Sequence, residues 1–257
     1  MQRRDFVWFA ALLGAGAQAQ VKDISDAINK AGRQRMLSQR MGKAWFCLAL
    51  GVDTKRANIV MEQSSNLFER QLEELKAYAP WAEVRETYTA LESAWAAYKV
   101  GLQAPSSDKS AANQLLQLDA KVLALAHKGT VQYEAASAKA VGKLVNIAGR
   151  QRMLSQRMAK FYFAAHMRAD AASAQAEIGK AHGEFLSALE VLRNAPEASG
   201  RIREELSLAD AQLVFFDAAL KRVGEGSAKS NALSNVFVSS ENLLAVMDKI
   251  TGLYAAI

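Results

Sequence analysis

The side chains best suited to binding chemistry lie in a string of eleven residues that occurs twice. AGRQRMLSQRM spans residues 31–41 and again 148–158. Each copy sets three arginines and one serine among small and apolar residues. A guanidinium binds a planar oxyanion with two parallel N–H donors, and a serine hydroxyl can add another. The repeated string therefore indicates a site for a small anion.

One arginine of each copy falls on a helix face made of small residues. At about 100° per residue, Arg35 shares its face with Ala31, Ser38 and Gly42, and Arg152 repeats this placement in the second copy. Small residues let a partner helix come close, so this face is expected to be buried. A buried guanidinium needs a counter-charge, and no acidic residue follows either arginine at three or four positions. The counter-charge must come from another helix or from a bound anion.

The arginines and serines of the string are the candidate binding residues, and a structural role is the alternative. An arginine on such a face can reach water along its aliphatic stem, or pair with a glutamate such as Glu73 or Glu190. The other arginines lie on a flank of the helix and are secondary candidates. The candidates are Arg35, Arg152, Ser38 and Ser155, with Arg33, Arg40, Arg150 and Arg157 as the secondary set.

The duplication extends beyond the string and divides the chain. Phe68 recurs 117 positions later as Phe185, in the same register as the string. Self-similarity at one fixed offset is typical of tandem modules. We expect two homologous modules, over residues 21–137 and 138–257.

The composition predicts an all-α fold. Only three prolines and 15 glycines occur in 257 residues, and helix-forming residues dominate. Apolar spacing predicts eight helices, and short loops between them are typical of antiparallel four-helix bundles. No breaker separates the fourth helix from the fifth, so one long helix, or a gentle kink, is expected to join the modules. The predicted ranges are 23–50, 54–78, 82–102, 109–137, 138–168, 172–194, 199–222 and 229–255.

The first nineteen residues predict export. They combine a basic start, a short apolar run and Ala17-Gln18-Ala19 as a small-x-small cleavage site, which is typical of a signal peptide over residues 1–19. Arg3-Arg4 also resembles a twin-arginine signal. The alternative is an uncleaved membrane anchor, although the run is short for a span of about 20 residues. We expect a periplasmic protein cleaved near Ala19, which excludes nucleic acid as a partner.

No pattern in the sequence indicates catalysis, a metal or a cofactor. His127, His166 and His182 lack metal-binding spacing and are expected to be exposed or packed. Cys47 is the only cysteine, and its apolar neighbours predict a buried thiol. The formal net charge is +6, but the charges are interspersed as on a solvated surface. An enzyme is the least favoured class.

The string and its surroundings resemble a known family. Asn-x-Ala-Gly-Arg-Gln-Arg-Met-Leu-Ser-Gln-Arg-Met, starting at Asn29 and again at Asn146, resembles the signature of the PilJ-type domain, the N-terminal sensory region of type IV pilus methyl-accepting chemotaxis transducers. It is also similar to the periplasmic sensor domain of nitrate/nitrite sensor kinases. Outside the string, the likeness is only to a generic helical bundle.

The resemblance implies a role for two pairs of residues. In the nitrate sensors the arginine before the methionine binds the anion, which points to Arg35 and Arg152, and the family glycine corresponds to Gly32 and Gly149. Those sensors bring two copies of the helix together across a dimer axis. Two modules in one chain could build the same pairing internally, with Arg35 facing Arg152. A homodimer is the other way to form it.

These observations lead to one expected function and one alternative. We expect a periplasmic, non-enzymatic sensory protein that binds a small oxyanion, with nitrate or nitrite favoured. Since the sequence contains no kinase or methyl-accepting module, it is expected to act with a membrane sensor kinase or chemotaxis transducer. The alternative is a structural or adaptor protein of the type IV pilus or chemosensory envelope machinery that binds no small ligand.

Overall fold

The computed structural model describes residues 20–257 except 138–139, 170 and 222–226. These residues form eight α-helices and no strand, which confirms the all-α prediction. The predicted signal peptide lies outside the described residues. The helices are α1 (Ile24–Ala49), α2 (Thr54–Tyr78), α3 (Ala82–Leu102), α4 (Lys109–Ala135), α5 (Ala140–His166), α6 (Ala171–Asn194), α7 (Gly200–Lys221) and α8 (Ser227–Ala255).

Local signals explain where the first helices begin and end. The Asp23 side chain caps α1 by accepting a hydrogen bond from the backbone N–H of Asp26 at 2.8 Å. After α1 the chain turns through Gly51, at φ 68°, and Asp53, at φ 44°. Both angles lie in the left-handed region, which glycine adopts without cost and aspartate tolerates better than most residues.

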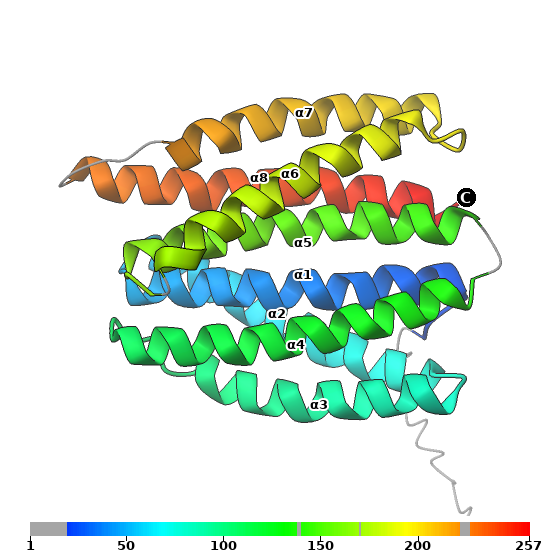
Figure 1. Cartoon of the computed structure of the whole chain (residues 1–257), viewed down its shortest axis with the longest axis horizontal. Coiled ribbons are helices and arrows are strands. Elements are labelled where there is room, and N and C mark those ends of the chain that lie inside the picture. Colours follow the sequence, from blue (N-terminus) through cyan, green and yellow to red (C-terminus); the bar gives the residue numbers. More distant parts are fainter. Residues whose placement is uncertain (1–19, 138–139, 170, 222–226) are drawn as a thin grey trace, which may run out of the picture.

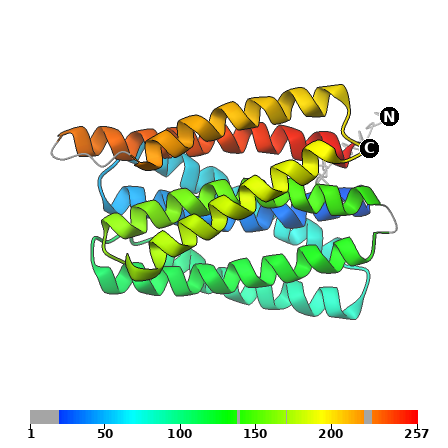
Figure 2. The ribbon, with the colours of Figure 1, turned by 45° about the horizontal axis from the view of Figure 1, so that its top comes forward.

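The two helices that carry the string form the centre of the molecule. α1 and α5 lie side by side and run in the same direction, and each contacts the other more extensively than any other helix (Figures 1 and 2). In the first half of the chain, α1 also packs against α2 and α4, and α3 covers α4. In the second half, α5 packs against α6 and α8, and α7 covers α8. The two halves therefore share one core.

The expected continuous helix between the modules is wrong. α4 ends at Ala135, and α5 begins at Ala140 and runs back in the opposite direction (Figure 1). A Cβ atom at Gly142 would lie 2.6 Å from the Ser137 hydroxyl oxygen. Because glycine has no Cβ, Ser137 can pack against the start of α5. A straight helix would hold the two strings apart and leave their small-residue faces in water. The reversal buries them against each other.

The same contacts recur in both halves, with one shift in register. The Tyr133 hydroxyl donates to the carbonyl of Leu75, and the Tyr254 hydroxyl donates to the carbonyl of Leu192. The acceptors are 117 positions apart, as in the string, but the tyrosines are 121 apart. Structural counterparts in α4 and α8 are therefore related by 121, a shift of about one helical turn.

Other sequence predictions have mixed outcomes. Cys47 is buried and unpaired, as predicted, and burial raises the pKa of its thiol. Among the described residues, no helix is both long and apolar enough to cross a membrane. The division at residues 137 and 138 stays a prediction.

Candidate functional site

The two glycines of the string lie close together where α1 packs against α5. A Cβ atom built on Gly32 would lie 3.2 Å from Nη2 of Arg35, 3.6 Å from Nη2 of Arg152 and 4.0 Å from the Gly149 Cα. The glycines leave the space into which both guanidinium groups fold. The structure thus brings Arg35, Arg152, Gly32 and Gly149 together within one chain.

Arg152 has a carboxylate partner. Its Nη1 donates to Oδ1 of Asp248 at 2.6 Å, and its Nη2 donates to the carbonyl of Asn29 at 3.1 Å. The Arg152 side chain is fully buried. Burial lowers the pKa of Arg152 to about 10, although the charge of Asp248 opposes the shift. The counter-charge is therefore Asp248 on α8, rather than Glu73 or Glu190.

Arg35 is equally buried but differs in its partners. Its Nη2 donates to the side-chain oxygen of Asn146 at 2.7 Å, and its Nη1 lies 3.3 Å from Nδ1 of His127. Among the described residues its Nε has no hydrogen-bond partner, and the same is true of the Nε of Arg152. Asn146 in turn donates from Nδ2 to Glu134. No carboxylate within the described part of the chain forms an ion pair with Arg35.

The surroundings of Arg35 oppose its charge. Burial, followed by the charges of Arg150 and Arg152, lowers the pKa of Arg35 to about 9, although the charge of Glu134 opposes the shift. The group is still protonated at neutral pH. Burial and the charges of Arg35 and Arg150 also lower the pKa of His127 below 6.5, which keeps that imidazole neutral. A positive charge is thus held in a dry, positively charged setting, where a bound anion would stabilise it.

The register of α4 and α8 explains why the two arginines differ. The offset of 121 that relates Tyr133 to Tyr254 also relates His127 to Asp248. The histidine therefore occupies, beside Arg35, the place that the aspartate holds beside Arg152. The chain has a carboxylate in one half and a neutral ring in the other, at equivalent positions.

The remaining arginines of the string all have carboxylate partners. On α1, Arg33 pairs with Asp248 at 3.2 Å, and Arg40 pairs with Glu241 at 2.5 Å. On α5, the two equivalent arginines pair with acidic residues of α6. These pairs are Arg150 with Glu184 and Arg157 with Glu177. Of the six arginines in the two copies, Arg35 alone lacks such a partner among the described residues.

A cavity of about 300 Å³ opens beside Arg35. It lies between α4, α5 and α6, and it reaches the side chains of His127 and Arg150. Its lining includes both polar or charged groups and apolar side chains. The lining residues are Arg35, Ala120, Leu123, Ala124, His127, Arg150, Met153, Leu154, Arg157, Glu177, Lys180, Ala181 and Glu184.

The two candidate serines do not face this cavity. The Ser38 hydroxyl donates to the carbonyl of Arg35 at 3.0 Å, and the Ser155 hydroxyl donates to the carbonyl of Arg152 at 2.9 Å. Each serine is fully buried, and its hydroxyl proton is used in a hydrogen bond to the preceding turn of its own helix. Their expected role as ligand donors stays a prediction, and this geometry gives it no support.

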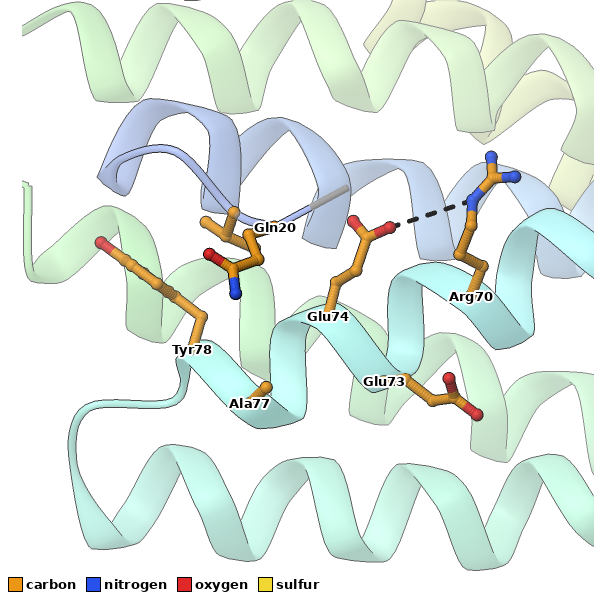
Figure 3. Close-up of a pocket in the computed structure, with 7 residues that line it drawn as sticks. Gln20, Arg70, Glu73, Glu74, Ala77 and Tyr78 are labelled. Carbon is orange, nitrogen blue, oxygen red and sulfur yellow. Dashed lines mark ion pairs between the residues drawn. The ribbon is translucent and has the colours of Figure 1, made fainter. Parts of the chain in front are cut away.

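A second cavity of similar size, also about 300 Å³, lies between the start of α1 and α2. Its walls include Glu73, Glu74 and Tyr78 (Figure 3). Glu74 pairs with Lys30 at 2.7 Å. It also lies 3.9 Å from Arg70, a pair that Figure 3 marks with a dashed line. The acidic side chains make this cavity unsuitable for an anion, so the cavity at Arg35 is the better candidate.

Sequence reasoning missed three residues that define the site. His127 was expected only to be exposed or packed, and Asp248 and Asn146 were not candidates. Asn146 repeats Asn29 at the offset of the string, so the repeat itself carried that signal. His127 and Asp248 are related by the offset of 121 instead. This offset becomes visible in the structure, through the matching contacts of Tyr133 and Tyr254.

The fold and the paired strings define a class, a duplicated helical-bundle protein built around two equivalent arginines. Residues 17–120 and 133–214 match the model of the family PilJ, described as type IV pili methyl-accepting chemotaxis transducer N-term. The chain belongs to this family, which confirms the predicted resemblance to the PilJ-type domain. No curated protein and no solved structure matches the chain.

Proposed function

We propose that this protein is a periplasmic, non-enzymatic sensor that binds a small monovalent oxyanion at Arg35, with nitrate or nitrite the first candidates. It reports by docking to a membrane sensor kinase or chemotaxis transducer. Family membership supports the sensory role. The uncompensated charge of Arg35 beside an open cavity supports the ligand class.

The buried guanidinium of Arg35 is the observation that carries this proposal. A charge held away from water without a carboxylate is costly, and an anion entering the cavity would remove that cost. The Nε of Arg35 is buried and has no hydrogen-bond partner among the described residues. Any ligand that binds only the folded state also stabilises it, so anion binding and folding are linked.

His127 supplies a second donor in this proposal. A guanidinium has no acceptor, so the 3.3 Å contact between Arg35 Nη1 and His127 Nδ1 requires Nδ1 to accept. The neutral ring then carries its proton on Nε2, which can donate to an anion. Arg150 and Arg157 also line the cavity, but their charges are already balanced by Glu184 and Glu177. Arg35 and Lys180 are then the two lining cations without a carboxylate partner among the described residues, and Arg35 is the buried one that an anion would neutralise.

The test is anion-dependent thermal unfolding and calorimetry of the mature protein. Nitrate, nitrite, sulfate and phosphate are compared at constant ionic strength. We expect stabilisation by nitrate or nitrite of about 2.7 kcal/mol when the anion is at 100 times its Kd. Arg35→Gln should remove this response. Arg40→Gln is the control, because Arg40 belongs to the same string but pairs with Glu241 on α8.

The outcomes separate the two candidate roles. An unchanged response in Arg35→Gln would rule out this site. No response to any anion in the wild-type protein would favour a structural or adaptor role.

A further inference from the structure

We propose that the Arg35 cavity accepts a small organic monocarboxylate, whose carboxylate binds Arg35 and whose short apolar body lies along the cavity wall. This inference rests on the proposed function, since it takes the cavity to be an anion site. It extends the ligand class from inorganic oxyanions to carboxylates of a few carbon atoms.

The other half of the chain provides the template for the bound carboxylate. Asp248 places a carboxylate oxygen 2.6 Å from Nη1 of Arg152, and the carbonyl of Asn29 accepts from Nη2. At Arg35, Asn146 accepts from Nη2 through its backbone carbonyl at 3.4 Å and through its side-chain oxygen at 2.7 Å, but His127 replaces the aspartate. A carboxylate from solution would thus give Arg35 the charge balance that Asp248 gives Arg152.

The walls of the cavity favour an apolar body on that carboxylate. Leu123 of α4, Met153 and Leu154 of α5, and Ala181 of α6 line it. Met153, Leu154 and Ala181 are at most 3% exposed and form a fixed floor, and the partly buried Leu123 supplies apolar surface that is open to the cavity. A nitrate ion would leave this surface to water in a cavity of about 300 Å³. Each methylene buried against it should strengthen binding roughly fourfold.

Acidic groups of the cavity exclude a second negative charge. Glu177 and Glu184 line it together with the arginines that they pair with. A dicarboxylate would bring its second carboxylate close to these side chains, at a cost from like-charge repulsion and desolvation. Lys180 also lines the cavity and offsets part of this cost, so the preference for an uncharged tail comes from the apolar walls together with the two glutamates.

The experiment is a calorimetric titration of the mature protein with a homologous series. Formate, acetate, propionate and butyrate are compared with nitrate and with succinate at constant ionic strength. We expect affinity to rise roughly fourfold for each methylene from acetate to butyrate. Succinate should bind at least tenfold more weakly than butyrate.

Two variants assign the effect to this cavity. His127→Asp places a carboxylate beside Arg35 at the position equivalent to Asp248, and it should abolish binding of nitrate and carboxylates alike. Leu123→Gln should flatten the dependence on chain length while nitrate binding persists. Leu125→Gln is its control, because Leu125 is a partly buried α4 residue that does not line the cavity. Circular dichroism checks that each variant folds, and Arg35→Gln replaces His127→Asp if that variant does not.

The possible results distinguish this inference from the proposed function. Nitrate binding without any gain from added methylenes would overturn the carboxylate inference and leave the proposed function intact. Binding of neither nitrate nor carboxylates would overturn both. A chain-length dependence that persists unchanged in Leu123→Gln would also overturn the inference, because the apolar body would then bind elsewhere.

Discussion

Arg35 and Arg152 have identical sequence neighbours for several residues on each side, yet their charges are balanced differently. The difference comes from one residue on a neighbouring helix, His127 in the first half and Asp248 in the second. The arginine with a carboxylate beside it is balanced within the fold. The arginine without one depends on a histidine, an asparagine and whatever enters the cavity.

The glycines beside these arginines give a prediction at the residue scale. Replacing a helical glycine by alanine ordinarily stabilises a protein by about 1 kcal/mol. Gly32→Ala should not show this gain in stability, because the new Cβ would lie 3.2 Å from Nη2 of Arg35. That guanidinium is held in place by its hydrogen bond to Asn146. The guanidinium must move, so the response to anions should weaken. Urea unfolding and an anion titration measure the two effects.

Gly183 provides the matched control for this change. It lies within α6, and a Cβ there would meet nothing within 4 Å. Gly183→Ala should therefore show the gain of about 1 kcal/mol that Gly32→Ala lacks. Equal gains in both variants would contradict the close approach at Gly32.

At the scale of single helices, the sequence was a good guide except at one junction. The ranges predicted for α2 and α3 match the structure, because Pro80 and the turn at Gly51 are strong local signals. The break between α4 and α5 has no proline. It forms because the faces of α1 and α5 bury each other, which is a tertiary effect that local sequence does not encode.

Ion pairs between α1 and α8 give a prediction at the scale of helices. Glu241 binds Arg40 at 2.5 Å and the buried Lys43 at 2.7 Å. Burial alone would raise the pKa of Glu241, but the charges of Lys43 and Arg40 lower it from 4.5 to about 2. A lowered folded-state pKa contributes stability that is present above pH 4.5 and lost as the pH falls toward 2.

Glu241→Gln should therefore lower the free energy of unfolding at pH 7 by roughly 3 kcal/mol. The difference from the wild type should shrink as the pH falls from about 4.5 toward 2, because the wild-type carboxylate then takes up its proton. Urea unfolding across this range measures it. Glu62→Gln, at an exposed position on α2, should change little at any pH. A difference that does not depend on pH would contradict the assignment of the stability to Glu241.

The site was predictable in part, for reasons that extend over the whole molecule. The duplicated string pointed to the pairing of Arg35 with Arg152, because a repeated small-residue face requires a partner. The asymmetry between them was not predictable, since it depends on α4 and α8 following an offset of 121 while the string follows 117. The string places the two arginines at the α1–α5 interface. The residues of α4 and α8 beside them, His127 and Asp248, determine which arginine has a carboxylate partner.

The shared core also determines how the whole molecule unfolds. Since α1 and α5 are each other's largest contact, neither half can lose its structure without exposing the face of the other. The four tryptophans, Trp8, Trp45, Trp81 and Trp95, all lie in the first half of the sequence, and the second half has none. Their fluorescence reports on the first half alone, whereas far-UV circular dichroism reports on both.

A cavity in the second half should therefore destabilise the first. Phe216 on α7 is fully buried, so Phe216→Ala should cost about 3–5 kcal/mol. The fluorescence and circular dichroism midpoints in urea should move together by the same amount. Phe215→Ala, where the side chain is 64% exposed, should change stability by no more than about 0.5 kcal/mol. A fluorescence midpoint that stays in place while the circular dichroism transition splits would mean that the halves unfold separately, and the α1–α5 interface would then be too weak to couple them.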